Sequence, residues 1–186
     1  MTLFTSRGYP YPTYADPADF PDQIQDLATA IDNDIEGLYD RVTAGYNQPT
    51  CIVRAVGVNQ AVATGVDVTC TYAEEVYDNA GMFNIGVSTT TITFPQSGIY
   101  VATNRVTFLT NGNAGGRQVA LTSTGSLGIV GRKSILGNVN VSTAVHQTAV
   151  FYTEAATTLT VVMRQNSGLS VNSSTRHLAV SKVSDL

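Results

Sequence analysis

Tryptophan is absent from this chain of 186 residues, and histidine and cysteine occur only twice each. His146 and His177 have no His, Cys or carboxylate neighbour at the spacing of a metal site, so no metal centre or cofactor is expected. Cys51 and Cys70 allow at most one disulfide. Because Cys70 falls on the apolar side of an alternating pattern, we expect a small buried hydrophobe and two free thiols.

Long apolar runs are also missing. No stretch of about eighteen apolar residues occurs, so no membrane insertion is expected. The N-terminus has no charged segment followed by an apolar one, and we therefore expect no secretory signal peptide. Basic residues do not cluster in the sequence, which argues against a nucleic-acid partner.

Charged residues make up only 13% of the chain, about half the usual share. Threonine, serine, asparagine, glycine and valine are abundant instead, which is typical of an extracellular or virion β protein. The net charge of −4 is unevenly distributed, since residues 1–50 carry eight acidic and two basic residues while residues 51–186 carry six acidic and eight basic. The first part is therefore acidic and the second weakly basic.

A heptad pattern of apolar residues predicts a helix over residues 21–44. A helix of this length with an exposed apolar stripe is marginal in water, so it needs packing partners. Branched residues at both core positions favour three strands over two, and we therefore expect a short trimeric coiled-coil stalk. The alternative is an amphipathic helix that packs on its own β domain. The predicted core positions are Ile24, Ala28, Ile31, Ile35, Leu38 and Val42.

Residues 1–20 are rich in tyrosine and proline and cannot form a helix. We expect an extended or polyproline-like arm, since tyrosine combines a large apolar ring with a hydroxyl and suits the groove of a partner. The alternative is a disordered tail. Asp19 is a plausible helix cap, and Gly45 with Pro49 predicts a hinge over residues 45–50. The residues expected to anchor the arm are Tyr9, Pro10, Tyr11, Pro12 and Tyr14.

Residues 51–186 read as strands throughout. Apolar and polar residues alternate over residues 66–72, 100–108, 145–151 and 159–163, with Asn104 as an exception on the apolar side. Glycine- and asparagine-rich turns separate these segments, at residues 79–81, 96–98, 111–116 and 166–168. The predicted fold class is mainly β, an antiparallel β-sandwich or jelly-roll head domain.

The sequence contains no recognisable arrangement of catalytic residues, so no enzyme is expected. Ser126 lacks the spacing of a nucleophile elbow and an acid–histidine pair. The segment from Gly112 to Gly116 lacks the lysine of a phosphate loop. Asp32 and Asp34 faintly resemble the start of a calcium loop, but its twelfth position is Thr43 and the segment reads as helix.

The segment from Thr91 to Val101 contains Phe94, Pro95, Gly98 and Tyr100. This pattern resembles the central signature of the jelly-roll family that tumour necrosis factor shares with the globular heads of complement and collagen-like proteins. The resemblance covers about 130 residues and implies a first strand at residues 55–56, a strand at residues 83–86 and a closing strand over residues 175–183. His177-Leu178 departs from it, since the family usually has a Gly-Phe pair there. The resemblance also implies a homotrimer.

The N-terminal stretch from Gly8 to Ala28 resembles the opening of small tail or fibre proteins of phages that infect actinobacteria. Together the two resemblances imply a trimeric phage protein on the virion surface, assembled in the host cytoplasm and anchored through its arm to capsid or tail proteins. Decoration of the particle, a head fibre and a minor tail protein all stay open. The alternative function is a receptor-binding head that recognises host cell-wall glycan or another surface receptor.

Overall fold

The computed structural model describes the chain except for residues 1–2, 5–9, 12–19, 126–127 and 186. It divides into two compact units, residues 1–47 and residues 48–186, which we call the N-terminal unit and the head. Each is described by itself. The described helix is not long and apolar enough to cross a membrane.

The N-terminal unit contains two short strands and one helix. Strands β1 (Leu3–Phe4) and β2 (Pro10–Tyr11) pair antiparallel, with Phe4 opposite Pro10 and Leu3 opposite Tyr11. Two of the five predicted anchoring residues, Pro10 and Tyr11, are therefore in strand conformation. Tyr9, Pro12 and Tyr14, like the predicted cap Asp19, lie outside the described residues.

Helix α1 (Phe20–Tyr46) covers the predicted stalk and extends beyond it at both ends. Gly45 does not end the helix as predicted. The helix ends one residue later, at Tyr46, and Pro49, which has no amide hydrogen, follows shortly afterwards. All six predicted core positions are exposed in the single chain, with Ile31 at 41% and Ile35 at 57% of their full surface.

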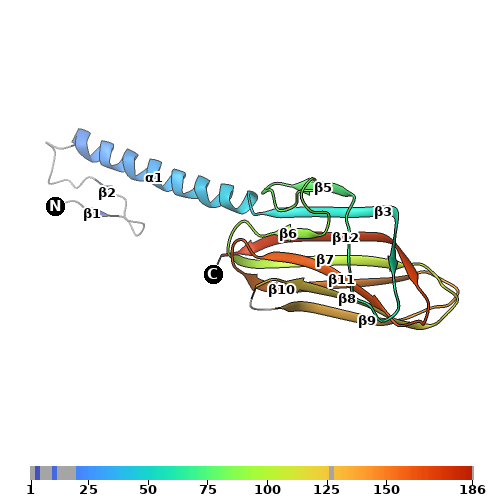
Figure 1. Ribbon diagram of the computed structural model, residues 1–186. Helices are drawn as coiled ribbons and strands as arrows, with labels where there is room; N and C mark the ends of the chain where they lie inside the picture. The colour runs from blue at the N-terminus through green and yellow to red at the C-terminus, as the bar shows by residue number, and fades with distance from the viewer. Residues whose placement is uncertain (1–2, 5–9, 12–19, 126–127, 186) are drawn as a thin grey trace. The chain divides into compact units, whose positions relative to one another are not determined.

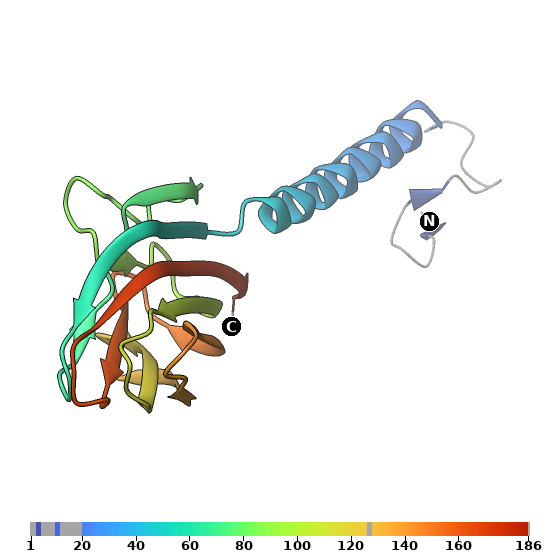
Figure 2. The same ribbon diagram turned by 90° about the vertical axis from the view of Figure 1, so that its right-hand side faces the viewer.

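The head is a sandwich of two antiparallel sheets, seen in two orientations in Figures 1 and 2. The long sheet has the order β10-β7-β12-β3-β5, with strands Thr143–Thr153, Gly98–Phe108, Val171–Ser184, Thr50–Val62 and Glu74–Asp78. The short sheet has the order β4-β11-β8-β9, with strands Val68–Thr69, Thr158–Gln165, Gly115–Ser123 and Ile129–Gly137, and β6 (Thr91–Thr93) pairs with β11. The predicted two-sheet antiparallel fold is confirmed.

The core lies between the two sheets and follows the alternation of the sequence. Tyr100, Ala102, Val106 and Phe108 of β7 are buried, and Leu159, Val161 and Met163 of β11 face them from the other sheet. Asn104 is also buried, at 1% exposure, and neither polar atom of its amide has a partner among the described residues. Asn104, the polar exception in the apolar alternation of residues 100–108, therefore places a polar side chain in the core.

Two strand predictions are wrong. Residues 83–86 are not a strand but part of a loop, because the Asp78 carboxylate accepts hydrogen bonds from the backbone amides of Ala80 and Phe83 at 3.0 and 2.7 Å. Such side-chain acceptors replace the partners that a sheet would supply. In the predicted strand over residues 66–72, only Val68–Thr69 pairs as a strand.

Candidate functional site

The outward surface of the long sheet, which we call the open face, consists mainly of uncharged side chains. One cross-strand row contains Ile52, Ala179, Thr103 and Thr148, from β3, β12, β7 and β10. The hydroxyls of Thr103 and Thr148 are hydrogen-bonded at 3.0 Å. Val150 is 64% exposed in the next row. Because sheets usually expose charged residues to water, a face with several uncharged rows is a candidate association surface.

A second surface lies at the far end of the head, opposite Thr50. The loops that follow β3, β7, β9 and β11 all end there, since Val62 pairs with Val171, Phe108 with Ser173, and Gly115 with Gly137. Exposed apolar side chains lie in these loops and at the end of β9: Val66, Leu136, Val139, Val141 and Leu169.

Hydrogen bonds from one buried side chain tie these loops together. The Gln165 amide donates to the carbonyls of Val62 and Leu169 at 3.0 and 2.7 Å. Its oxygen accepts from the backbone amide of Ser167 at 2.7 Å and from the Thr64 hydroxyl at 3.3 Å. The loops after β3 and β11 therefore share one amide and are held in a defined arrangement.

The loop after β7 joins the same network. Asn111 donates to the Ser167 hydroxyl at 2.6 Å, and Asn113 donates to the Ser167 carbonyl at 3.1 Å. Arg117 lies beneath this loop, 1% exposed, and its guanidinium reaches the Asn111 side-chain oxygen at 3.3 Å. The turn predicted at residues 111–116 is shorter in the structure, because Gly115 and Gly116 belong to β8.

Burial and charge combine in Arg117. No carboxylate pairs with it among the described residues, its Nε has no hydrogen-bond partner, and burial lowers the pKa of the guanidinium. A Cβ on Gly137 would lie 2.9 Å from the Arg117 Cζ, so only glycine leaves room for the guanidinium at that position of β9. We expect this arginine to fix the far end of β8 rather than to bind a ligand.

The four signature residues lie where the chain enters the head and build its fold. The ring of Phe94 packs on the rings of Tyr100 and Phe151, with centroids 4.7 and 5.8 Å apart. Pro95 follows Phe94 in an exposed position, and the Tyr100 hydroxyl donates to the Gln96 carbonyl at 3.0 Å. Burial raises the pKa of Tyr100.

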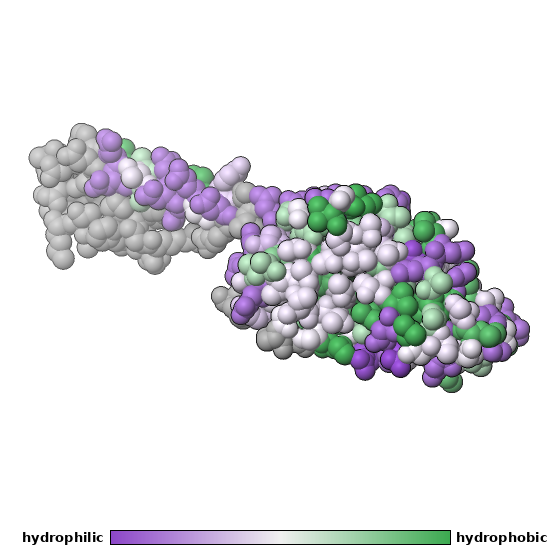
Figure 3. All heavy atoms as spheres, in the orientation of Figure 1, coloured by the Kyte–Doolittle hydropathy of each residue, from purple (hydrophilic) through white to green (hydrophobic). Residues whose placement is uncertain are grey.

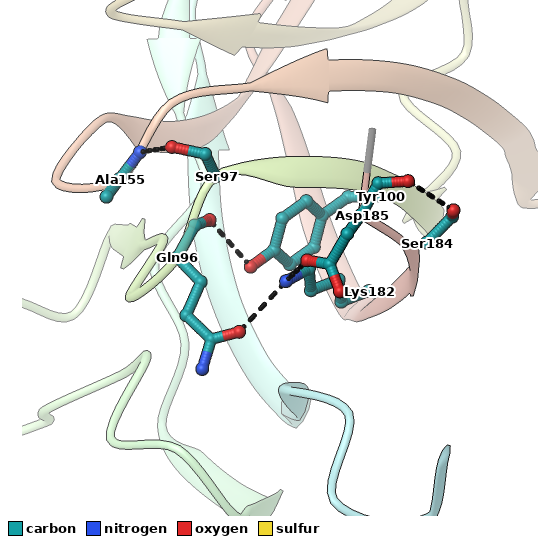
Figure 4. Close-up of polar contacts among 7 residues, drawn as sticks. All are labelled: Gln96, Ser97, Tyr100, Ala155, Lys182, Ser184 and Asp185. Carbon is teal, nitrogen blue, oxygen red and sulfur yellow. Dashed lines mark hydrogen bonds and ion pairs between the residues drawn. The ribbon is translucent and has the colours of Figure 1, made fainter. Parts of the chain in front are cut away.

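Lys182 has a buried side chain beside these rings. Its ammonium donates to the Gln96 side-chain oxygen at 2.9 Å and also to the Asp185 carboxylate (Figure 4). A Cβ on Gly98 would lie 2.5 Å from the Lys182 Cε, so the glycine of the signature makes space for the lysine. The same turn is held by the Ser97 hydroxyl, which accepts from the Ala155 amide at 3.1 Å.

Sequence reasoning missed the buried cations Arg117, Arg176 and Lys182. The sequence signal for these residues is their position in the alternation of each strand. Arg117 lies two residues from the buried Val119, and Arg176 and Lys182 alternate with the buried Leu178 and Val180, so all three point inward. A charged residue at an inward position of an otherwise apolar alternation is the pattern that finds such residues.

The remaining candidates from the sequence do not come together. Cys51 and Cys70 are both buried and free, and Cys70 belongs to the core as predicted. His146 is exposed on β10, as predicted. Ser126 lies outside the described residues. Within the described ranges, no three His, Cys, Asp or Glu side chains gather as a metal site would require.

Comparison with known proteins identifies the fold. No protein-family model matches the chain, and no curated protein matches its sequence. The globular domain of zebrafish complement 1qA is 13% identical with a TM-score of 0.52, and the match covers 75% of this chain and 99% of that one. Eiger TNF from S. frugiperda (12% identity, TM-score 0.51, 74% and 95% covered) and murine APRIL at pH 5.0 (14%, 0.51, 72% and 99%) are also similar.

These neighbours have the jelly-roll fold of tumour necrosis factor and complement heads, and the head of this chain has the same fold. The resemblance read from Phe94, Pro95, Gly98 and Tyr100 is therefore confirmed for the fold. At identities of 12 to 14% the likeness extends to the fold alone.

Proposed function

We propose that the chain is a homotrimeric structural protein of a phage virion, a surface fibre, decoration or minor tail component without catalytic activity. Its N-terminal arm binds the capsid or tail, α1 forms a three-stranded coiled coil, and the heads associate through the open face of the long sheet. The observation that carries the proposal is the exposed apolar stripe of α1.

The stripe favours association because its apolar side chains are exposed to water in the part of the N-terminal unit that the structure describes. Five of its six side chains are large and between 41 and 57% exposed, and Figure 3 shows hydrophobic atoms among hydrophilic ones along the helix. Burying a Leu, Ile or Val side chain fully contributes about 1.5–3 kcal/mol. Three helices that bury these side chains against one another gain stability that a lone helix lacks.

The open face supports the same proposal. Its rows around Ala179 and Val101 contain threonine, serine and aliphatic residues without a charge, and such rows can be buried between chains at low cost. Heads that touch raise the effective concentration of the helices that precede them, so the two surfaces reinforce each other.

The arm is assigned to the anchor because of its composition and its resemblance to the opening of phage tail and fibre proteins. Pro10 and Tyr11 are extended in β2, and an extended segment is the form that lies along a partner groove. We propose capsid or tail proteins as that partner and the virion surface as the location.

Light scattering coupled to size-exclusion chromatography tests the trimer. We expect a mass of three chains for the wild type, and a weakened stalk but trimeric heads for Ile35→Asp, because the new charge enters the helix seam. Asn33→Asp is the matched control, since it adds the same charge at an exposed position on the other side of the helix. A wild-type chain that elutes as a monomer at high concentration contradicts the proposal.

Deletion of residues 1–20 tests the anchor. Particles assembled with the shortened chain should lose the protein, while the purified protein keeps the mass of the trimer. Retention of the shortened chain on washed particles at the wild-type copy number would exclude the arm as the anchor.

The far end of the head favours a second candidate, recognition of host cell-wall glycan or another receptor. Four loops meet there, and Gln165 and Ser167 hold three of them in a fixed arrangement that suits a binding surface. Binding of labelled heads to host cells tests this function. A head that labels no host surface leaves the structural role alone.

A further inference from the structure

Four basic residues form one row across the open face. Arg54 on β3 pairs with His177 on β12, His177 with Arg105 on β7, and Arg105 with His146 on β10. All four point outward, because Val53, Asn104, Val106 and Leu178, which flank them along the strands, are buried. At about 4.8 Å between strands, the row spans roughly 14 Å.

The charge of the open face is concentrated in this row. The row on one side contains Ile52, Ala179, Thr103 and Thr148, and the row on the other contains Val56, Thr175, Thr107 and Ala144. Neither carries a charge. The other basic residues of these strands, Arg176 and Lys182, point inward and are buried.

Only one member of the row is neutralised. Arg54 makes a bidentate ion pair with Glu74 of the edge strand β5, with both N–O distances at 2.7 Å. Arg105 has no carboxylate partner among the residues that the structure describes, and it lies between His177 and His146. Burial, followed by the charges of Arg105 and Arg54, lowers the pKa of His177.

Such a row costs stability in an isolated sheet, because like charges directly opposite on neighbouring strands repel. A bound anion replaces this repulsion by attraction between the anion and the basic side chains. A guanidinium offers two parallel N–H donors to an oxyanion, and an imidazolium on each side adds one more. The Glu74 carboxylate is occupied by Arg54 at the other end of the row.

We propose that Arg105, His146 and His177 form a binding site for an oxyanion, a sulfate or phosphate group. The anion lies over Arg105 and accepts hydrogen bonds from the imidazoles on both sides. The site is complete within one chain and goes beyond the proposed trimer. If the open faces meet in the trimer, the bound anions neutralise Arg105 where the chains approach one another.

The test follows the two imidazoles by NMR in the full-length, nitrogen-15-labelled chain near pH 6, where histidine titrates. Inorganic sulfate is the probe, and sodium chloride at equal ionic strength is the blank. We expect saturable chemical-shift changes for the imidazole resonances of His146 and His177, and an increase in the pKa of His177. Arg105→Gln should weaken binding about tenfold or more, because it removes the charged bidentate donor.

Arg132→Gln is the matched control, since Arg132 is an exposed arginine on β9 of the other sheet, and binding should be unchanged. Should Arg105→Gln fail to fold, Arg105→Lys keeps the charge, loses the planar pair of donors and should bind with lower affinity. Shifts that depend only on ionic strength, or wild-type affinity for sulfate in both Arg105 variants, overturn the proposal.

A second titration, with glycerol phosphate, separates the sources of the group. Binding as tight as that of inorganic sulfate indicates a free ion, and clearly tighter binding indicates a phosphate carried by a larger ligand. Both results support the site. Light scattering on the same samples reports the oligomeric state separately, so a monomer that binds sulfate contradicts the trimer and not the anion site.

Discussion

Replacement of Arg176 by methionine tests whether a buried cation without a carboxylate stabilises the head. Arg176 is fully buried in β12, next to an irregularity in the pairing between Ser173 and Thr175. Its guanidinium donates to the carbonyls of Thr71, Val58 and Ser173 at 2.9, 3.0 and 2.8 Å. It therefore joins β3, β12 and the segment after β4.

Two effects oppose each other in this substitution. Hydrogen bonds to a charged donor contribute about 1.5–3 kcal/mol each, and three carbonyls lose their partner. Against this, burial lowers the pKa of Arg176, and its Nη2 has no hydrogen-bond partner in the described part of the chain, so removal of the charge recovers part of its desolvation. The three bonds outweigh the recovered desolvation, and we expect a net loss of about 2–4 kcal/mol.

Urea unfolding of the full chain at one fixed protein concentration measures the loss. The midpoint should fall with an unchanged slope, because the surface exposed on unfolding stays the same. Arg132→Met, at an exposed position, should stay within about 0.5 kcal/mol of the wild type. An Arg176→Met head that is as stable as the wild type, or more stable, refutes the reasoning, because desolvation then equals or exceeds the three hydrogen bonds.

Three further outcomes are expected. Gly98→Ala should destabilise the head by about 1–3 kcal/mol, measured as a lower urea midpoint, because the new Cβ meets the Lys182 side chain. Since the pKa of His177 is lower in the folded state than its unfolded value near 6.5, the unfolded state binds more protons, and the free energy of unfolding should fall as pH decreases below about 6.5. His177→Gln should remove that part of the slope in urea titrations between about pH 7 and pH 5. Burial raises the pKa of Cys51 to about 12 and also raises the pKa of Cys70. Maleimide near neutral pH should therefore label neither thiol in the native protein, and both thiols in concentrated guanidinium chloride. Labelling of either cysteine in the native protein would contradict this expectation.

The local pattern was sufficient to predict the central strands of the core, whereas the helix extends beyond the predicted residues 21–44 at both ends. Tyr100 to Phe108 alternate with outward residues because one face of β7 is buried, and that period is visible without a structure. The strand that the family resemblance implied at residues 83–86 is absent, because Phe83 packs into the core from a loop and its backbone amide donates to the Asp78 carboxylate.

The basic row was beyond prediction from the sequence. Arg54, Arg105, His146 and His177 lie far apart along the chain, and each alone reads as an ordinary outward residue of a strand. Only the register of β3, β12, β7 and β10 brings them opposite one another, and a slip of one residue in any strand would separate them. The far-end turns at residues 111–116 and 166–168 were predicted from the sequence, but their common location also depends on strand pairing.

Gln165 holds the backbone of the loops at the far end of the head, so their conformation does not depend on their exposed side chains. Its amide fixes the backbone around Val62, Ser167 and Leu169 from within, while the side chain of Leu169 is exposed. Mutations can therefore change the exposed side chains of these turns while the backbone conformation is kept. This makes the far end of the head a suitable place for sequence diversification and for grafted peptides.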